Sequence, residues 1–204
     1  LIKHTHTHTR MLNKSRIEKL NKCLYEYCQP LSLRLLSPLD KDRIKFFFEQ
    51  WQIDDENLFE IFLWKDGIPY DESLPTYSFN FTGFGVIPPL EEINEIIKIE
   101  SSNPYWRKSL FPLVTSFAGD FLLYETDKNS DVYGQIFLYS PNLGYVDYQV
   151  SYFDSVNSMI DTIVENFEKK VFVYNPIEMS LDIDFTLHFE ISKVLNPNSE
   201  YWQQ

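Results

Sequence analysis

The sequence predicts an α+β fold in which an antiparallel meander sheet packs against several helices. Two patterns lead to this prediction. Apolar residues recur every three or four positions in several segments, which is the period of an amphipathic helix, and four short apolar runs separated by turn residues follow one another in the middle of the chain. With 204 residues, of which 44% are apolar and 17% aromatic, the chain can bury a core of its own.

Five helices are expected, each from an apolar stripe and a start or stop signal. Ser37 is the expected N-cap of the second helix, with Pro38 in its first turn. Asp54 or Asp55 caps the third, which stops at Gly67. The expected helices lie in residues 11–29, 37–51, 54–67, 90–99 and 154–170, the last capped by Asp154 and showing the clearest period.

Four strands follow from the apolar runs at 110–117, 121–125, 135–139 and 145–148. Residues 118–120, 127–130 and 141–144 supply the turns between them. Residues 77–81 also alternate as a strand does, within a long connection. The segment 179–195 has two interpretations, because its alternating apolar residues favour an extended chain, our first choice, whereas Asp184 could cap a helix that ends near Leu195.

The predicted division of the chain is a leader at 1–10, an N-terminal helical extension at 11–36, an α+β domain at 37–174 and a C-terminal extension packed on the domain at 175–204. The leader precedes Met11 and is interpreted as an appended or mis-started segment. Its His4, His6 and His8 alternate with threonine, so they would share one face of an extended strand and could chelate a transition metal there.

The charge balance argues against some partners and favours others. Thirty acidic against 18 basic residues give a net charge of −12, which is unfavourable for binding nucleic-acid phosphates and favourable for binding a basic protein. Cys23 and Cys28 are too few for a disulfide scaffold and are expected to be reduced. Without an apolar run of 18 residues or a secretory signal pattern, the chain is expected to be soluble and cytoplasmic, with no membrane partner.

The residues suggest no catalytic chemistry. His188 is the only histidine outside the leader, no nucleophile elbow or phosphate-binding loop occurs, and Gly83 and Gly85 form only a turn. Asp127 and Asp131 resemble the start of a calcium loop, but the glycine and the closing acidic residue are missing, so a hairpin tip is expected. We therefore predict a protein without enzymatic activity, cofactor or metal.

Several weak motifs, in order, resemble those of the SUKH superfamily, which includes the yeast cell-wall assembly regulator and many bacterial immunity proteins. The resemblance covers about residues 37–167. Trp64, Gly67, Pro112 and Gly119 are its structural motif positions. The segments that carry it are FEIFLWKDG at 59–67, LFPLVTSFAGD at 110–120, VYGQIF at 132–137 and FDSV at 153–156.

The resemblance implies helices packed on one antiparallel sheet and an immunity protein that occludes the active site of a cognate, basic bacterial toxin, often a nuclease in this superfamily. The alternative is a regulatory scaffold that binds a cellular protein, and a toxin gene immediately upstream would favour immunity. A monomer or weak homodimer is expected. The expected partner-binding residues flank the sheet and its loops: Asp66, Tyr70, Asp71, Glu72, Tyr105, Trp106, Asp120, Tyr124, Glu125 and Asp127.

Overall fold

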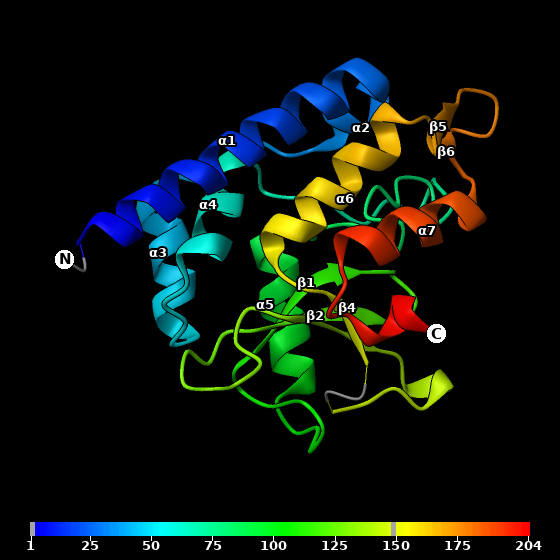
Figure 1. Ribbon diagram of the computed structural model, residues 1–204. Helices are drawn as coiled ribbons and strands as arrows, with labels where there is room; N and C mark the ends of the chain where they lie inside the picture. The colour runs from blue at the N-terminus through cyan, green and yellow to red at the C-terminus, as the bar shows by residue number, and fades with distance from the viewer. Residues whose placement is uncertain (1–2, 148–149) are drawn as a thin grey trace.

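The computed structural model describes residues 3–147 and 150–204 and confirms the α+β fold. Within this part, seven α-helices surround a four-stranded antiparallel sheet, and a two-stranded sheet stands apart (Figure 1). The helices are α1 (Lys3–Tyr27), α2 (Gln29–Arg34), α3 (Lys41–Gln50), α4 (Glu56–Trp64), α5 (Leu90–Glu100), α6 (Val156–Glu168) and α7 (Phe185–Leu195). The strands are β1 (Leu110–Thr115), β2 (Phe121–Glu125), β3 (Ile136–Tyr139), β4 (Ser151–Phe153), β5 (Phe172–Asn175) and β6 (Ser180–Ile183). Of the described helices, none is both long and apolar enough to cross a bilayer.

The larger sheet is the predicted meander, with strand order β1-β2-β3-β4. Its fourth strand differs from the prediction, because β4 begins only at Ser151 and pairs Phe153 with Ile136. Tyr145 makes only an isolated bridge with Ser140, and residues 148–149 lie outside the described part. A 3-10 turn at Pro141–Leu143 occupies the start of this connection, so the chain pairs with β3 later than expected.

The connection between α4 and α5 was expected to hold a strand at residues 77–81, and this prediction is wrong. Those residues form turns. A strand would place Tyr77, Phe79 and Phe81 on one face, but Tyr77 is exposed while the two phenylalanines are buried in the core. The backbone of the connection reaches the sheet further on, where Val86 bridges Thr115 at the end of β1. Burial in the main core, and not strand pairing, therefore explains Phe79 and Phe81.

Both faces of the meander are covered, which explains why every residue of β2 is buried. One face packs into the main core beneath the helices, and the other packs on a smaller cluster centred on Trp106. Side chains alternate between the two faces, as strand geometry requires. The main core takes Phe111, Leu122, Tyr124, Ile136 and Leu138, and the smaller cluster takes Leu110, Phe121, Leu123 and Tyr139.

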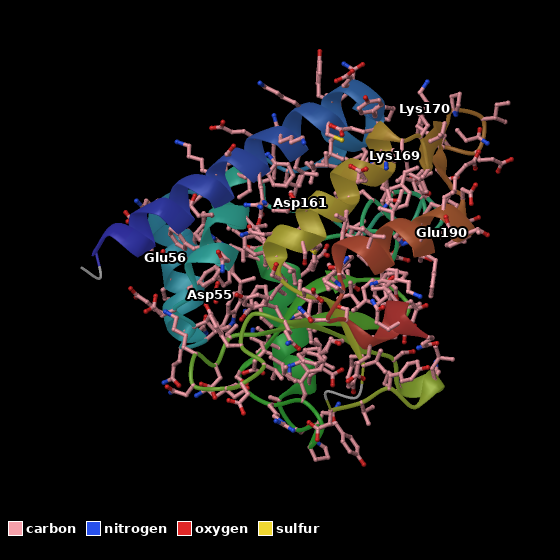
Figure 2. The ribbon with its side chains drawn as sticks, in the orientation of Figure 1. Asp55, Glu56, Asp161, Lys169, Lys170 and Glu190 are labelled. Atoms are coloured by element: carbon pink, nitrogen blue, oxygen red, sulfur yellow. The ribbon has the colours of Figure 1, made fainter. Side chains whose placement is uncertain are left out.

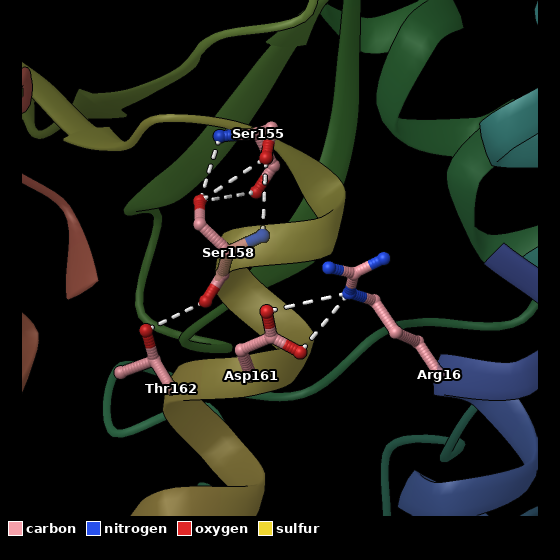
Figure 3. Close-up of polar contacts among 5 residues, drawn as sticks. All are labelled: Arg16, Ser155, Ser158, Asp161 and Thr162. Carbon is pink, nitrogen blue, oxygen red and sulfur yellow. Dashed lines mark hydrogen bonds and ion pairs between the residues drawn. The ribbon is translucent and has the colours of Figure 1, made fainter. Parts of the chain in front are cut away.

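The long helix α1 lies across α6 and α4, with Ile17, Leu20 and Leu24 buried beneath it. Because α1 begins at Lys3, the three histidines of residues 4–8 belong to a helix and not to the extended strand whose face they were expected to share. Arg16 extends the contact with α6, where its Nε donates to the Oδ1 and Oδ2 atoms of Asp161 at 3.1 and 3.3 Å (Figure 3).

The start of α6 shows a capping box formed by two serines. The backbone N–H of Ser158 donates to Ser155 Oγ at 3.0 Å, and the N–H of Ser155 donates to Ser158 Oγ at 2.9 Å (Figure 3). The prediction that Asp154 caps this helix is therefore wrong. Asp154 instead binds the C-terminal segment, since Ser199 Oγ donates to its Oδ1 at 2.6 Å.

The start of α3 also differs from the prediction, because Asp40, not Ser37, is its N-cap. Asp40 Oδ1 accepts from the N–H of Arg43 at 2.9 Å. Two backbone hydrogen bonds hold the preceding chain away from helical geometry, from Leu36 N to the Gly67 oxygen and from Asp66 N to the Leu36 oxygen, at 2.9 and 3.0 Å. The helix can begin only after this tether.

Both interpretations of the segment 179–195 hold in part. Residues 180–183 are extended as β6, but from Asp184 onward the first choice is wrong, because Asp184 Oδ1 accepts from the N–H of Leu187 at 3.1 Å and caps α7. The alternating apolar residues of α7 are exposed or half-buried. Its buried residues are His188 and Ser192, which are four positions apart and so share one face of a helix. Beyond this segment, Trp202 Nε1 donates to the backbone carbonyl oxygen of Tyr152 at 2.5 Å.

The helices α6 and α7 meet through buried polar side chains. Asn196 Nδ2 donates to Thr162 Oγ1 at 3.0 Å, and Asn166 Nδ2 lies 3.1 Å from His188 Nδ1. His188 is 3% exposed, and its burial lowers the pKa of the imidazole to about 4. Among the described residues, His188 Nε2 has no hydrogen-bond partner. The interface therefore requires a neutral imidazole.

Acid should weaken the fold through His188. Its pKa in the folded chain is about 4, below the 6.5 of an unperturbed histidine, so the unfolded chain takes up the proton first as the pH falls. The contribution of neutral His188 to the unfolding free energy is fully present above pH 6.5 and is lost toward pH 4. The loss between pH 6.5 and 5 is about 2 kcal/mol. Urea unfolding at several pH values should show this loss in the wild type relative to His188→Asn. Parallel curves for the two proteins would contradict it.

Two glycines of the predicted motif have left-handed backbones but different surroundings. Gly67 has φ +71°, and a Cβ there would lie 2.4 Å from the Ile87 oxygen. Gly119 has φ +88° in the β1–β2 turn, and a Cβ there would meet no described atom within 4 Å. Of the two, only Gly67 needs to be glycine for two reasons, because its backbone is left-handed and because no side chain fits beside Ile87.

Replacing these glycines by alanine should separate the two effects. Gly119→Ala should cost only the backbone strain, about 1–2 kcal/mol of unfolding free energy. Gly67→Ala should cost at least about 3 kcal/mol, because the new methyl group also displaces the backbone at Ile87. Equilibrium urea unfolding of both variants measures the difference, and equal losses would show that the close approach at Gly67 has no energetic weight.

Candidate functional site

Four of the ten expected partner-binding residues are buried: Asp66, Trp106, Tyr124 and Glu125. Asp66 serves as a remote cap for α5, because its Oδ1 accepts from the N–H of Leu90 at 3.0 Å and the residue before this helix, Pro89, has no side-chain acceptor. Burial raises the pKa of Asp66. Asp66 therefore connects the end of α4 to the start of α5, and its buried side chain is not available to a partner.

The other three buried residues also have internal roles. Tyr124 is fully buried and donates its hydroxyl to Asp55 Oδ2 at 2.9 Å. Glu125 accepts from the N–H of Asp127 at 2.9 Å and so shapes the β2–β3 turn, and burial raises its pKa. Trp106 fills the smaller cluster beneath the sheet. Each of the four therefore exposes at most a small part of its surface to a partner.

The six remaining residues do not form one surface. Tyr70 packs on Phe117 at a ring distance of 5.3 Å, which places the 70–72 loop, with Asp71 and Glu72, beside the β1–β2 turn that contains Asp120. Asp127 lies in the β2–β3 turn, at the opposite end of β2. Consecutive turns of a meander alternate between ends of the sheet, so a five-residue strand separates these two groups by roughly 17 Å. Tyr105 stands apart in the loop before β1.

Asp71 is already committed to an internal interaction. Hydrogen bonds from Ser73 and Arg34 lower the pKa of this carboxyl to about 2. The Arg34 contact is an ion pair of 2.5 Å that joins the loop to α2. Asp71 therefore anchors the loop to α2, and only part of its side chain is accessible to a partner.

Two further motif residues have structural roles. The Trp64 Nε1–H donates to Asn21 Oδ1 at 2.9 Å and joins α4 to α1. Pro112 lies in the edge strand β1, where a missing N–H is tolerated, next to a break in the register between Pro112 and Val114.

A groove of about 480 Å³ lies between α3 and α4, and we call it the acidic groove. Its floor is apolar, with Phe48, Ile53 and Phe59. Positions 41, 45, 48 and 49 share one face of α3, and positions 56, 59 and 60 share one face of α4, so the helical period brings both sets to the groove. Its rim carries Glu49, Asp54, Glu56 and Glu60 together with Lys41 and Lys45.

The C-terminus of α3 places Ile53 at the centre of this surface. The N–H of Ile53 donates to the Phe48 oxygen at 2.9 Å, and that of Gln52 donates to the Glu49 oxygen at 3.0 Å, which is the Schellman pattern. Gln52 has φ 57°, where glycine is the usual residue. This turn ends the helix and directs the Ile53 side chain into the groove.

A buried carboxylate supports the groove from below. Asp55 Oδ1 accepts from the N–H of Leu58 at 3.1 Å and caps α4, while Oδ2 accepts from Tyr124 and Tyr133 at 2.9 and 2.7 Å. Burial and the nearby carboxylate raise the pKa of Tyr133 to about 12. Figure 2 shows Asp55 and Glu56 where α4 begins, beside α3. Asp55, expected as a possible cap of this helix, thus also links α4 beside the groove to β2 of the sheet.

Two further hollows adjoin the acidic groove. A middle hollow of about 400 Å³ shares Ile53 and Asp54 with it and includes Lys108, Asp127 and Lys128. The Lys128 ammonium lies 3.8 Å from Asp54 Oδ2. A third hollow of about 340 Å³ shares Ile53 and Lys108 with the middle one. The three form one continuous surface, to which Asp127 and Trp106 contribute among the expected partner residues.

The acidic groove combines features of protein-binding surfaces, namely an apolar centre and a charged rim. The described residues contain no group of three histidine, cysteine or acidic side chains placed to hold a metal ion. Sequence reasoning missed the rim residues Glu49, Asp54, Glu56 and Glu60. The signal was present, since four of the seven residues in DDENLFE at 54–60 are acidic.

No protein-family model matches the chain, and no curated protein matches it either. The resemblance to the SUKH superfamily therefore stays a prediction from the sequence motifs.

Removing the Asp55 carboxylate should cost far more than removing an exposed cap. Asp40 and Asp55 both accept from the N–H three residues ahead, but Asp55 is 2% exposed and also holds two tyrosine hydroxyls. We expect Asp40→Ala to lower the unfolding free energy by about 1 kcal/mol. Asp55→Ala should lower it by about 3 kcal/mol or more, because buried polar groups lose their partner. Urea unfolding measures both, and similar losses would contradict a supporting role for Asp55.

Proposed function

We propose that this chain is a binding protein of the SUKH immunity type, which neutralises a basic protein toxin by covering its active site. The acidic groove between α3 and α4 is the observation that carries the proposal. It is an accessible apolar surface whose rim has four carboxylates against two lysines. A partner surface with lysine or arginine around an apolar centre complements it.

Charge would act mainly on the rate of association. The net charge of −12 attracts a basic protein from a distance, and the rim carboxylates align it over the groove. Asp54 is well suited to this role, because its side chain is fully exposed. Exposed charge pairs add little affinity in water, so most of the binding energy must come from the apolar floor.

The floor is preorganised for binding. The Phe48 ring lies 5.7 Å from that of Phe59, 6.2 Å from that of Phe62 and 6.1 Å from that of Phe111. These contacts connect the groove to the main core, so binding need not order its floor. A rigid surface loses less conformational entropy on association, which supports a tight complex.

The experiment that tests the function is co-purification of the chain with the products of its neighbouring genes, at low and at physiological salt. A salt-sensitive complex that abolishes the toxicity of its partner would support immunity. A stable complex with a non-toxic cellular protein would favour a regulatory scaffold instead. If no basic protein is bound under either condition, the proposal fails.

Charge reversal in the groove should slow association with this partner. Glu49→Lys with Glu56→Lys should lower the association rate at least about tenfold at low salt and flatten its salt dependence. Glu178→Lys with Asp182→Lys is the matched control, since it changes the net charge equally at the β5–β6 hairpin, away from α3 and α4 (Figure 1). Stopped-flow or surface-binding kinetics measure both, and equal effects would remove the groove from the interface.

A further inference from the structure

The third hollow has a different chemistry from the acidic groove. It holds about 340 Å³ between the end of α3, the end of α5 and β1, and we call it the tryptophan pocket. Trp51, Trp106, Ile53, Ile97 and Leu110 form its walls. Gln50, Ser101 and Lys108 are its polar lining residues. A small, mostly apolar concavity with few polar groups is the usual form of a binding pocket.

Both indoles are fixed in place before any ligand arrives. Trp51 Nε1 donates to Asn94 Oδ1 at 3.0 Å, and its ring lies 5.4 Å from that of Phe47. Trp106 makes edge-to-face contacts with Phe121 and Tyr139 at 5.5 and 5.3 Å. The two side chains are 7% and 8% exposed, so only a small part of each ring faces the pocket. The walls therefore need no rearrangement to receive an apolar group.

The tryptophan pocket is continuous with the proposed interface. Ile53 lines the acidic groove, the middle hollow and the tryptophan pocket, and Trp51 and Lys108 line the last two. Lys108 Nζ also hydrogen-bonds Gln52 Oε1, which fixes the lysine at the turn between them. A protein that covers the groove thus extends directly over this pocket.

We propose that the tryptophan pocket receives a single apolar side chain, aromatic or large aliphatic, from the same basic protein that covers the acidic groove. This inference rests on the proposed function and names the anchor of the partner. The apolar walls favour burial of a hydrocarbon side chain. Lys108 disfavours a cationic side chain, although indole rings would otherwise attract one. The volume of about 340 Å³ has room for one side chain.

A titration with single-residue probes tests the pocket without the partner. The probes are N-acetyl-leucine amide, N-acetyl-tryptophan amide and, as the cationic control, Nα-acetyl-lysine amide. We expect the first two to shift the indole N–H signals of Trp51 and Trp106 saturably in nitrogen-15 NMR spectra, and to leave those of Trp64 and Trp202 unchanged. Equal binding of the lysine probe, or no saturable shift with any probe, would overturn the inference.

A substitution that fills the pocket with a larger side chain can be compared with the same substitution outside the pocket. Ser101 lines the pocket at the exposed end of α5, so Ser101→Trp should weaken binding of the apolar probes at least about tenfold. Ile99→Trp is the control, because Ile99 is 73% exposed on the same helix and does not line the pocket. Thermal unfolding verifies that both variants fold. Equal effects of the two substitutions on probe binding would contradict the assignment.

Binding kinetics of the partner complex distinguish a failure of this inference from a failure of the proposed function. Ser101→Trp should speed dissociation of the partner about tenfold and leave the salt dependence of association unchanged, in contrast to charge reversal in the groove. If the complex forms and Ser101→Trp has no effect on it, the anchor is elsewhere and the pocket assignment falls while the proposed function stands. If no basic partner binds, the proposed function fails, and with it the anchor role, even where the probes bind.

Discussion

The buried carboxylate of Asp55 is the interaction on which the rest of this surface depends. One of its oxygens caps α4, and the other accepts hydrogen bonds from Tyr124 in β2 and Tyr133 in the following turn. A buried charge is stable only when such partners satisfy it. The same side chain therefore fixes the start of a helix, the end of the sheet and the position of the acidic groove between α3 and α4.

Other aspartates repeat this use of a carboxylate over a long sequence distance. Asp66 caps α5 from 24 residues away, and Asp154 holds the C-terminal segment through Ser199. Backbone N–H groups at helix starts lack internal partners, so a carboxylate from another segment can both cap the helix and join two parts of the chain. Some of the acidic side chains are thus used in hydrogen bonds within the fold. The net charge alone therefore does not locate the surface that binds a partner.

The surface around Ile53 combines two kinds of interaction site. In the proposed complex, exposed carboxylates such as Asp54 would attract and orient a basic protein, whereas Phe48 and the tryptophan pocket offer rigid apolar area. The Schellman turn at the end of α3 joins these parts, since it positions Ile53 between them. The left-handed conformation of Gln52 is the local cost of this turn.

Hydrophobic period and turn residues are local signals, and they were enough to predict the α+β class, most of the helices and the first three strands of the meander. The buried carboxylates, the start of β4 and the fold of residues 184–195 depend on contacts between distant parts of the chain. Asp66 and Asp54 are both acidic residues beside helix α4, yet one caps a distant helix and the other is fully exposed. Their roles depend on which N–H groups and rings the fold brings close, and such long-range neighbours leave no periodic trace in the sequence.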